Sequence, residues 1–510
     1  MISQLHIHKI FAERISQEIE NGNIRSREDL VRIKKRIAGE LGINVPSNPE
    51  ILPFIEDEKI KEILIRKPTR TISGVAIVAV MTSPFPCPHG RCLPCPGEPP
   101  HSPQSYTGHE PASLRAKRNN YDPYLQVKER LWQLSYIGHA TDKIDLIVMG
   151  GTFPARNFLY QEWFIKRCYD AMNSREASSL EEAKKLNEKA KNRCVGLTIE
   201  TRPDWCRLQQ VEKMLELGAT RVELGVQIID DKVLYEINRG HNVKDIIDAT
   251  RILKDAGFKV CYHIMPGLPY SDRENDIECF KKIFIDERFR PDMLKIYPTL
   301  VVKSSKLYEK WKKGEYKAID EEEAIEIISE MKRWVPEWVR IQRVERDIPS
   351  YLIEDGIKKS NLREMVKRRM DELGIKCRCI RCREVRDRKV YDVELIRRDY
   401  IASSGREIFL SIENKEKDLI VAYCRLRINK DFAIIRELKV HGSMVEIGKM
   451  HGDKWQHKGY GRILLKKAEE LSEKFKKDKI FVLSGVGAKE YYRKMGYVDE
   501  GFYMSKELAK

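Results

Sequence analysis

The chain has 510 residues, of which 42% are hydrophobic and 34% are charged, and at ~150 residues per domain this length predicts about three domains. No apolar run approaches the ~18 residues of a membrane helix and the N-terminus lacks an apolar secretory core, so we expect a cytoplasmic protein without a membrane partner. The formal net charge of +16 favours a polyanionic partner, nucleic acid first, although a lysine-rich solvated surface accounts for the charge equally well.

Residues 1–66 are predicted to be helical, because apolar residues recur at helical spacing from Ile10 to Ile19. A second amphipathic segment starts with a capping-box pattern at Ser26 and Asp29. This segment carries more basic than acidic side chains, which fits either a nucleic-acid contact or a solvated helix face. We therefore treat 1–66 as a helical region of its own.

Strands and helices alternate between residues 67 and 335. Six apolar runs predict strands, and amphipathic helices fill most of the gaps between them. This repeated β/α pattern implies a parallel sheet with right-handed crossovers. Since six units are too few for a closed eight-stranded barrel, we predict an α/β fold built on a partial β/α barrel, with its chemistry at the carboxyl ends of the strands. The predicted strands are 74–81, 144–150, 194–200, 221–227, 258–265 and 293–297.

Three cysteines, Cys87, Cys92 and Cys95, follow the first predicted strand. Three thiolates on one loop can hold an iron–sulfur cube, which takes four ligands, and the iron left open can bind a small molecule. A zinc knuckle without its fourth ligand is the alternative. Radical S-adenosylmethionine enzymes carry C-x3-C-x2-C at this place, and the spacing here is longer by one residue. Gly150 and Gly151 end the second strand, where that superfamily binds the methionine amino group and where a backbone without Cβ atoms permits close approach.

A basic stretch, predicted to be a linker over 336–389, follows the partial barrel. Residues 358–389 hold thirteen Lys or Arg and five Asp or Glu, a net charge of +8. A second cysteine triplet in this stretch suggests a structural zinc site, with free surface thiols as the alternative. We name His441 as the fourth ligand, with His451 and His457 behind it. The triplet consists of Cys377, Cys379 and Cys382.

From residue 390 to 510 the pattern changes to hairpins, one long helix and further short elements, which predicts a separate α+β domain. Its segment 456–461, QHKGYG, opens the long helix. Glycines at a helix N-terminus leave backbone N–H groups bare, and the helix dipole favours an anion such as a pyrophosphate. The pattern resembles the Q-x-x-G-x-G turn with which Gcn5-related acetyltransferases hold acetyl-CoA, and an ordinary helix-start turn is the alternative. Tyr491 and Tyr492 follow, and a tyrosine near the sulfur can protonate a thiolate.

Together the two halves resemble one family, the catalytic subunit of the Elongator complex in its stand-alone archaeal or bacterial form. The resemblance runs over nearly all of 75–510. Its motifs are long, and they include QSYTGHEPASLRA (104–116), IVMGGTF (147–153), IETRPD (199–204), NRGH (238–241), KIYPTL (295–300) and SGVGAKEYYRKMGY (484–497).

The resemblance implies a tRNA carboxymethyluridine synthase, an acyltransferase-class enzyme that builds a carboxymethyl group on carbon 5 of the wobble uridine. Cys87, Cys92 and Cys95 would ligate a 4Fe–4S cluster, whose open iron would bind S-adenosylmethionine and cleave it to a 5′-deoxyadenosyl radical with an electron from an external donor. That radical would take hydrogen from the methyl group of acetyl-CoA, and the carbon radical would add to the uridine before thioester hydrolysis. Such chemistry requires the two small-molecule sites to share one cavity.

The resemblance also implies site residues and partners. Lys143 and Tyr492 are the expected catalytic residues; without the resemblance, Lys143 would be interpreted as a solvated lysine at a strand start. The expected macromolecular partner is the tRNA anticodon stem-loop, bound by the N-terminal helices and the basic stretch, and no obligate protein partner is expected. The expected cofactor-binding residues are Lys143, Glu437, Leu438, Lys439, Val440, Gly459, Tyr460, Gly461, Arg462 and Tyr492 for acetyl-CoA, and Gly150 and Gly151 for S-adenosylmethionine.

Two rival functions stay open on the sequence. A protein-lysine acetyltransferase with a structural iron–sulfur cluster would need a general base near the thioester and a groove for a peptide. A tRNA-binding scaffold without catalysis would keep the basic surfaces and dispense with the chemistry. Formation of 5′-deoxyadenosine in the presence of acetyl-CoA and tRNA separates the radical enzyme from both.

Overall fold

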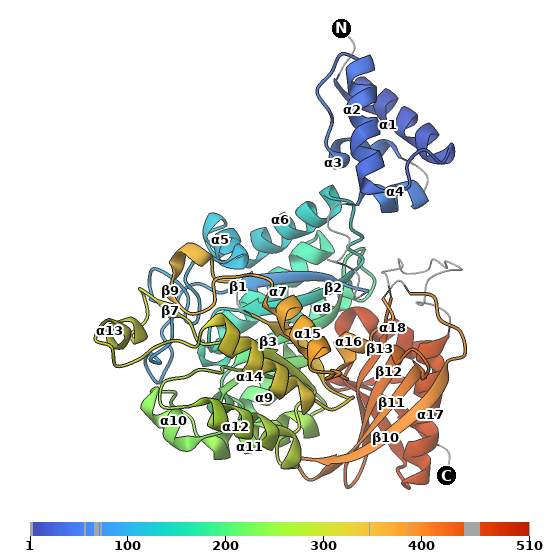
Figure 1. Ribbon diagram of the computed structural model, residues 1–510. Coiled ribbons are helices and arrows are strands. Elements are labelled where there is room, and N and C mark those ends of the chain that lie inside the picture. Colours follow the sequence, from blue (N-terminus) through green and yellow to red (C-terminus); the bar gives the residue numbers. More distant parts are fainter. Residues whose placement is uncertain are drawn as a thin grey trace.

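The computed structural model describes residues 4–55, 58–65, 71, 74–345, 347–386, 388–442 and 459–508. The chain forms a small helical body, a half-barrel and a second sheet (Figure 1). Within the described ranges, no helix combines the length and the apolar character that crossing a bilayer requires.

Four helices form the N-terminal body, which stands at one end of the molecule above α6 (Figure 1). The predicted capping box is present: the Ser26 hydroxyl accepts from the Asp29 backbone N–H at 3.1 Å, and the Asp29 carboxylate accepts from the Ser26 backbone N–H at 3.0 Å. Phe11, Ile15 and Ile33 belong to a core of its own. The helices are α1 (Gln4–Glu20), α2 (Arg27–Glu40), α3 (Asn48–Ile51) and α4 (Glu58–Leu64).

Seven parallel strands form the half-barrel, in the order β1-β2-β3-β4-β5-β6-β8. All six predicted strands are present, and the apolar runs are explained by burial of parallel strands on both faces. The seventh strand, β8 (Arg340–Val344), pairs with β6 and comes from the stretch predicted to be a linker. The other six are β1 (Ala76–Met81), β2 (Lys143–Met149), β3 (Arg193–Thr201), β4 (Arg221–Gln227), β5 (Lys259–Ile264) and β6 (Met293–Ile296).

Helices cover the outer face of this sheet. The helix α15 (Leu362–Glu372) lies in the basic stretch and buries Leu362, Val366 and Met370 in the core of the half-barrel. Part of the predicted linker therefore packs as a component of the half-barrel. The remaining helices are α5 (Pro111–Arg118), α6 (Pro123–Tyr136), α7 (Phe158–Asn173), α8 (Leu180–Asn187), α9 (Leu208–Glu216), α10 (Asp231–Glu236), α11 (Val243–Asp255), α12 (Arg273–Ile285), α13 (Leu307–Lys312), α14 (Glu321–Arg333) and α16 (Ile380–Arg383), and β7 (Val301–Val302) pairs with β9 (Ile353–Asp355).

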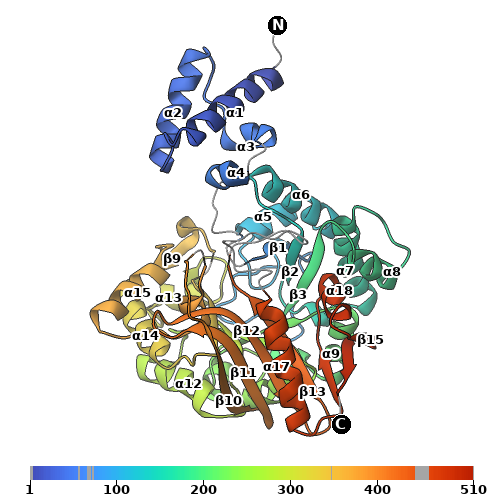
Figure 2. The same cartoon turned by 90° about the vertical axis from the view of Figure 1, so that its right-hand side faces the viewer.

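The second sheet has the order β10-β11-β12-β13-β14-β16-β15 and lies against the half-barrel (Figure 2). Its strand β13 (Ala433–Val440) runs parallel to β14 (Lys479–Val482), but they pair only as far as Ile435 and Val482. Beyond that point β13 stays paired with β12 as far as Val440 but no longer pairs with β14, which leaves an opening between β13 and β14. The other elements are β10 (Glu394–Ala402), β11 (Gly405–Asn414), β12 (Leu419–Ile428), α17 (Tyr460–Lys474), α18 (Lys489–Arg493), β15 (Val498–Glu500) and β16 (Tyr503–Glu507).

Candidate active site

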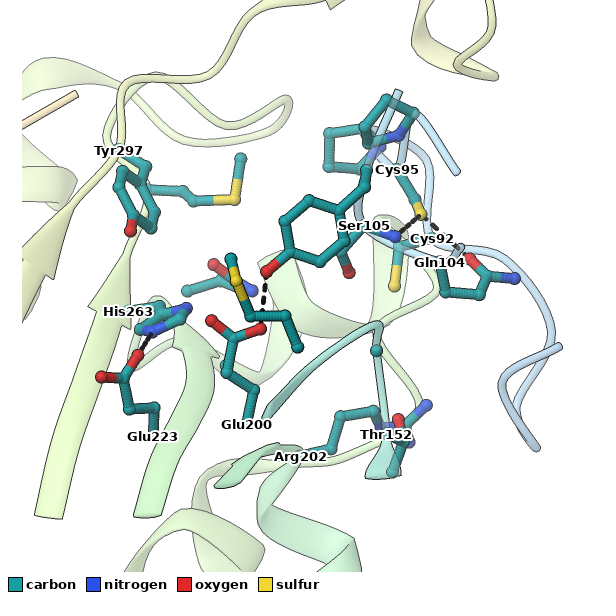
Figure 3. A pocket seen from close by; sticks show the side chains of 18 of the residues that line it. Cys92, Cys95, Gln104, Ser105, Thr152, Glu200, Arg202, Glu223, His263 and Tyr297 are labelled. Carbon is teal, nitrogen blue, oxygen red and sulfur yellow. Dashed lines mark hydrogen bonds and ion pairs between the residues drawn. The ribbon is translucent and has the colours of Figure 1, made fainter. Parts of the chain in front are cut away.

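A cavity of about 160 Å³ lies at the carboxyl ends of the half-barrel strands, and we call it the cysteine pocket (Figure 3). The loop that follows β1 forms one wall, and Cys87, Cys92 and Cys95 all line the cavity. Glu200, at the end of β3, and Gln227, the last residue of β4, line it as well. The structure therefore brings the first cysteine triplet to the strand ends, where chemistry is expected in a β/α fold.

Cationic and polar groups surround the three sulfur atoms. Arg239 Nη1 donates to Cys92 Sγ at 3.4 Å, and His89 Nε2 lies 3.1 Å from the same sulfur. The Cys95 thiol donates to Gln104 Oε1 at 3.1 Å. Burial raises the pKa of the Cys92 thiol, and Arg239 opposes that rise. Arg239 thus favours the thiolate, the form that binds metal.

The two cysteine triplets differ in spacing. The sulfur atoms of Cys377, Cys379 and Cys382 all lie within 4.8 Å of one another, whereas those of the first triplet do not meet this limit. A single tetrahedral zinc with Zn–S bonds of ~2.3 Å holds its sulfurs about 4 Å apart. In an iron–sulfur cluster each thiolate binds a different iron, so the sulfurs lie further apart. The first triplet therefore fits a cluster and the second fits one metal ion.

The pair Gly150-Gly151 lies beside the cysteine loop with φ angles of +121° and +99°. A Cβ on Gly150 would lie 2.3 Å from Thr82 Oγ1, and one on Gly151 would lie 3.0 Å from Gln104 Cβ and 3.9 Å from Cys87 Sγ. Gly151 lines the cysteine pocket. Only glycine permits this backbone to pass so close to Thr82 and to the cysteine loop.

Glu223 on β4 is the centre of a charged group on the wall of the cysteine pocket. Its Oε2 accepts from Lys295. The same oxygen lies 2.9 Å from His263 Nε2 (Figure 3). The Tyr106 hydroxyl donates to Glu200 at 2.6 Å, and Glu200 lies 3.8 Å from Lys295. Burial alone would raise the pKa of Glu223, but Lys295 and His263 hold it well below its usual range. The carboxylate is therefore ionised at neutral pH.

A second cavity, of about 650 Å³, lies at the amino ends of the half-barrel strands and extends into the opening between β13 and β14. We call it the thioester pocket. Lys143, the first residue of β2, lines it together with Tyr492 of α18. All of the residues predicted for acetyl-CoA line this cavity: Lys143, Glu437, Leu438, Lys439, Val440, Gly459, Tyr460, Gly461, Arg462 and Tyr492.

Buried lysines give the thioester pocket its electrostatic character. Burial lowers the pKa of Lys143 and of Lys439 to about 8 each, and it also lowers the pKa of Lys259. Burial would raise the pKa of Glu437, but Arg425 at 2.8 Å, with Lys259 and Lys439, brings it to about 2. The pocket therefore combines lysines whose pKa values are lowered by burial with a carboxylate that stays ionised at neutral pH.

The turn that opens α17 also lines the thioester pocket. Gly459 has a φ of +87°, and a Cβ on Gly461 would lie 2.9 Å from the Tyr491 hydroxyl. The first residues of the predicted turn, 456–458, lie outside the described residues. Burial raises the pKa of Tyr492, so its phenol stays protonated at neutral pH.

The cysteine pocket and the thioester pocket share none of their described lining residues. One opens at the carboxyl ends of the strands and the other at the amino ends, so the expected single cavity is not what the structure shows. The physical reason is the position of β13. Arg436 lines the thioester pocket and is paired with Asp292 just before β6, and this pair holds the second sheet at this end of the half-barrel.

The structure does not bring His441, the expected fourth zinc ligand, to the second triplet. Its Nδ1 lies 3.6 Å from Glu384 Oε2, and its ring centroid lies 5.4 Å from that of Tyr423. Burial lowers the pKa of His441 to about 3, so the imidazole is neutral. The further candidates His451 and His457 lie outside the described residues, within which the triplet has no fourth ligand of the His, Cys, Asp or Glu type.

Comparisons with known proteins cover nearly the whole chain. Residues 8–72 match the ELP3 N-terminal domain, 87–280 the Radical SAM superfamily, 291–372 the Radical SAM C-terminal domain and 377–497 the acetyltransferase (GNAT) family. The tRNA uridine(34) acetyltransferase of Methanocaldococcus infernus is 51% identical over 97% of this chain and 98% of its own length. The human Elongator complex protein 3 is 41% identical, over 97% and 96%.

The solved structure of archaeal Methanocaldococcus infernus Elp3, with an N-terminal deletion (1–46), has 50% identity and a TM-score of 0.76. It covers 86% of this chain, and all of that structure is matched. The chain belongs to the Elongator complex protein 3 family. Its radical SAM and GNAT domains therefore account for the half-barrel with its cysteine loop and for the second sheet with its glycine turn.

Several pocket residues of this family member were not among the predicted site residues. Arg221 and Lys259 line the thioester pocket, and His263 and Lys295 line the cysteine pocket. Two of them could have been predicted from the sequence. Lys295 belongs to the KIYPTL motif on which the family resemblance rests, and His263 lies four residues after Lys259, which places the two side chains on the same face of one strand. Charged residues at strand starts carried no signal of their own, because most such residues are solvated.

Proposed function

We propose that this protein modifies uridine 34 of tRNA by radical chemistry that draws two carbons from acetyl-CoA and leaves a carboxymethyl group on carbon 5. The observation that carries this proposal is one half-barrel with a cysteine-lined pocket at one end and a pocket of acetyltransferase type at the other. Two archaeal relatives, each 51% identical, are named tRNA uridine(34) acetyltransferase. The radical SAM and GNAT domains supply the two chemistries that the reaction needs.

The cysteine pocket has the residues to hold a 4Fe–4S cluster and S-adenosylmethionine. When bound, the cluster supplies the electron that cleaves S-adenosylmethionine into methionine and a 5′-deoxyadenosyl radical. Cys87, Cys92 and Cys95 would hold it, and Gly151 leaves room for the cofactor beside them. Arg202 Nη1 is buried without a hydrogen-bond partner and is available to a ligand carboxylate.

The thioester pocket has the matching features for acetyl-CoA. The first turn of α17 presents backbone N–H groups to a pyrophosphate. Beyond Ile435 the edge of β13 has lost its pairing with β14, so its backbone can bind the pantetheine arm. Lys143 and the protonated Tyr492 both line this pocket, where Lys143 would orient the thioester and Tyr492 would donate a proton to the departing thiolate.

An anticodon loop suits this site because its bases are unpaired and can be splayed out at low cost. The N-terminal helices and the basic stretch are the proposed phosphate contacts. Within that stretch Arg378 and Arg383 are engaged by Glu337 and Asp418, so exposed residues such as Lys358 would carry the contact. An external electron donor, a cytoplasmic location and independence from protein partners belong to the same proposal.

The test is an anaerobic incubation of the protein with reductant, S-adenosylmethionine, tRNA and acetyl-CoA labelled with carbon-13 in both acetyl carbons. We expect carboxymethyluridine with two labelled carbons at position 34, and none with Cys87→Ser. Labelled acetyl-lysine on protein with unmodified uridine would assign the lysine acetyltransferase function instead. Unmodified uridine together with tight tRNA binding and no 5′-deoxyadenosine would assign the scaffold.

A further inference from the structure

The two pockets adjoin each other inside the half-barrel. On β4, Arg221 lines the thioester pocket and Glu223, two residues further along, lines the cysteine pocket. At ~3.3 Å per residue these two positions are about 7 Å apart on the same face of the strand. On β5, Lys259 likewise lines the thioester pocket and His263 lines the cysteine pocket. One layer of side chains therefore separates the site of the thioester from the site of the cluster.

Glu223 and Arg221 face each other across this layer without a hydrogen bond. Arg221 Nε lies 3.6 Å from Glu223 Oε1, and both atoms are buried and have no hydrogen-bond partner. Buried polar atoms are rarely left in this state, because an unmet hydrogen bond costs free energy that contact with water would otherwise recover. A carbonyl oxygen between the two pockets would accept from Arg221 Nε.

Two further side chains complete the layer. Cys261 lies between Lys259 and His263 on β5, and its sulfur is within 4.8 Å of the ligand atoms of Glu223 and His263. Thr198 lies two residues before Glu200 on β3, so the two side chains are on the same face of the strand. The Thr198 hydroxyl is buried and has no hydrogen-bond partner. Neither Cys261 nor Thr198 is among the residues that line the two pockets, which agrees with a position between them.

Each of the two facing residues has a second partner. Arg221 donates to Asp145 Oδ2 at 3.1 Å, on the side of the thioester pocket. Glu223 is held by Lys295 and by His263 on the side of the cysteine pocket, and Figure 3 shows its contact with His263. If Arg221 and Glu223 separate, neither charge is left unpaired, so the large cost of isolating a buried charge does not arise.

We propose that the acetyl group reaches the cysteine pocket through this layer, and that Arg221 and Glu223 form the gate that it passes. This inference rests on the proposed function and adds the route to it. The acetyl group stays on its carrier during the passage, and Arg221 holds its carbonyl oxygen. Separate pockets then keep the thioester away from the radical site until the gate opens.

The experiment fills the layer from two different strands. The filling variants are Cys261→Met and Thr198→Leu, which add side-chain volume to the layer. The matched controls are Cys261→Ala and Thr198→Val. Thr198→Val should be tolerated because the Thr198 hydroxyl has no hydrogen-bond partner to lose. The measurement is deuterium transfer from trideuterated acetyl-CoA into 5′-deoxyadenosine, alongside acetyl-CoA affinity and melting temperature. We expect both filling variants to lose at least tenfold in transfer while acetyl-CoA affinity changes less than twofold, and the controls to transfer like the parent.

Parent-like deuterium transfer in the folded filling variants would overturn the route, and so would a loss of acetyl-CoA affinity equal to the loss of transfer. If one filling variant does not fold, the other decides. The parent protein separates the two claims. If the parent transfers no deuterium and modifies no uridine, the proposed function itself fails; if the parent does both and the filled variants do as well, only the route fails.

Discussion

Arg436 donates two hydrogen bonds of 2.7 Å to the carboxylate of Asp292, across the boundary between the second sheet and the half-barrel. Arg436 also pairs with Glu407, and all three side chains are buried. Burial would raise the pKa of Asp292, but Arg436 and Lys254 hold it well below its usual range. Arg436 directly precedes Glu437 of the thioester pocket, so this pair fixes the pocket to the half-barrel.

Arg436→Met is expected to destabilise the protein by about 3–5 kcal/mol, because it leaves the carboxylates of Asp292 and Glu407 buried without their main partner. The melting temperature should fall clearly, as measured by calorimetry. The control is Lys367→Met, which removes an exposed ion pair with Asp371 and should cost about 0.5 kcal/mol or less. Equal melting temperatures for the two variants would contradict this role of Arg436.

The two cysteine triplets should respond separately to substitution. We expect Cys87→Ser to lose iron and the visible absorption of the cluster while it keeps zinc, because its triplet has the wider spacing. Cys379→Ser should lose zinc and keep iron. Metal analysis of anaerobically purified protein measures both, and zinc retained in Cys379→Ser would refute the assignment of the second triplet.

Acetyl-CoA affinity should decrease as the pH rises from 7 to 9. Lys143 and Lys439 have pKa values lowered by burial to about 8, so both lose positive charge in this range while the ligand stays anionic. Loss of roughly 1.4 kcal/mol of attraction corresponds to a tenfold weaker Kd. Lys143→Met should weaken binding at pH 7 and flatten the pH dependence, which titration calorimetry can follow. An unchanged slope in Lys143→Met would rule out this lysine as its source.

The same lysines predict the sign of a stability change. In the unfolded chain a lysine titrates near 10.5, so between pH 8 and 10.5 the folded state binds fewer protons than the unfolded state. Stability contributed by this difference therefore rises with pH across that window. Denaturant unfolding of the parent and of Lys143→Met should show a smaller rise in the variant.

Gly461→Ala should weaken acetyl-CoA binding about tenfold and leave the iron content unchanged. The added Cβ would lie 2.9 Å from the Tyr491 hydroxyl and would push that ring within the thioester pocket. The matched control is Gly39→Ala in α2, where the Cβ meets no atom within 4 Å. That control should stabilise the protein by about 0.5–1 kcal/mol. Parent-like affinity in Gly461→Ala would mean that the pocket accommodates the methyl group.

Apolar periodicity predicted six of the seven half-barrel strands, because parallel strands buried on both faces have long apolar runs. It missed β8, whose sequence RIQRV contains two arginines and a glutamine. Arg340 of this strand is buried against Glu384, a residue 44 positions away in the chain. Since that ion pair exists only in the folded protein, local pattern alone could not identify the strand.

The site residues that could be predicted are those that belong to sequence motifs. Which of them share a cavity, and how far apart the cavities lie, could not be predicted from the sequence. Lys143 and Tyr492 do line one cavity, although Lys143 lies on β2 of the half-barrel and Tyr492 lies on α18, which follows the second sheet's strand β14 in the chain. Arg221 and Glu223 were not recognised, because a charged pair two residues apart on a strand gives no hint that each faces a different pocket. His441 was proposed as a metal ligand on residue type alone, and Glu384 occupies its Nδ1 side.

The placement of β13 has a consequence for how such proteins can be divided or recombined. The strand contributes Arg436 to the half-barrel and its next four residues to the thioester pocket, so the donor-binding half cannot be excised without exposing buried guanidinium and carboxylate groups to water. A foreign acetyltransferase domain fused to this half-barrel would need a cationic residue in the position of Arg436 to pair with Asp292. Without that residue its thioester-binding strand would not be fixed to the half-barrel. A division of the chain that preserves these ion pairs therefore has to keep β13 and the half-barrel together.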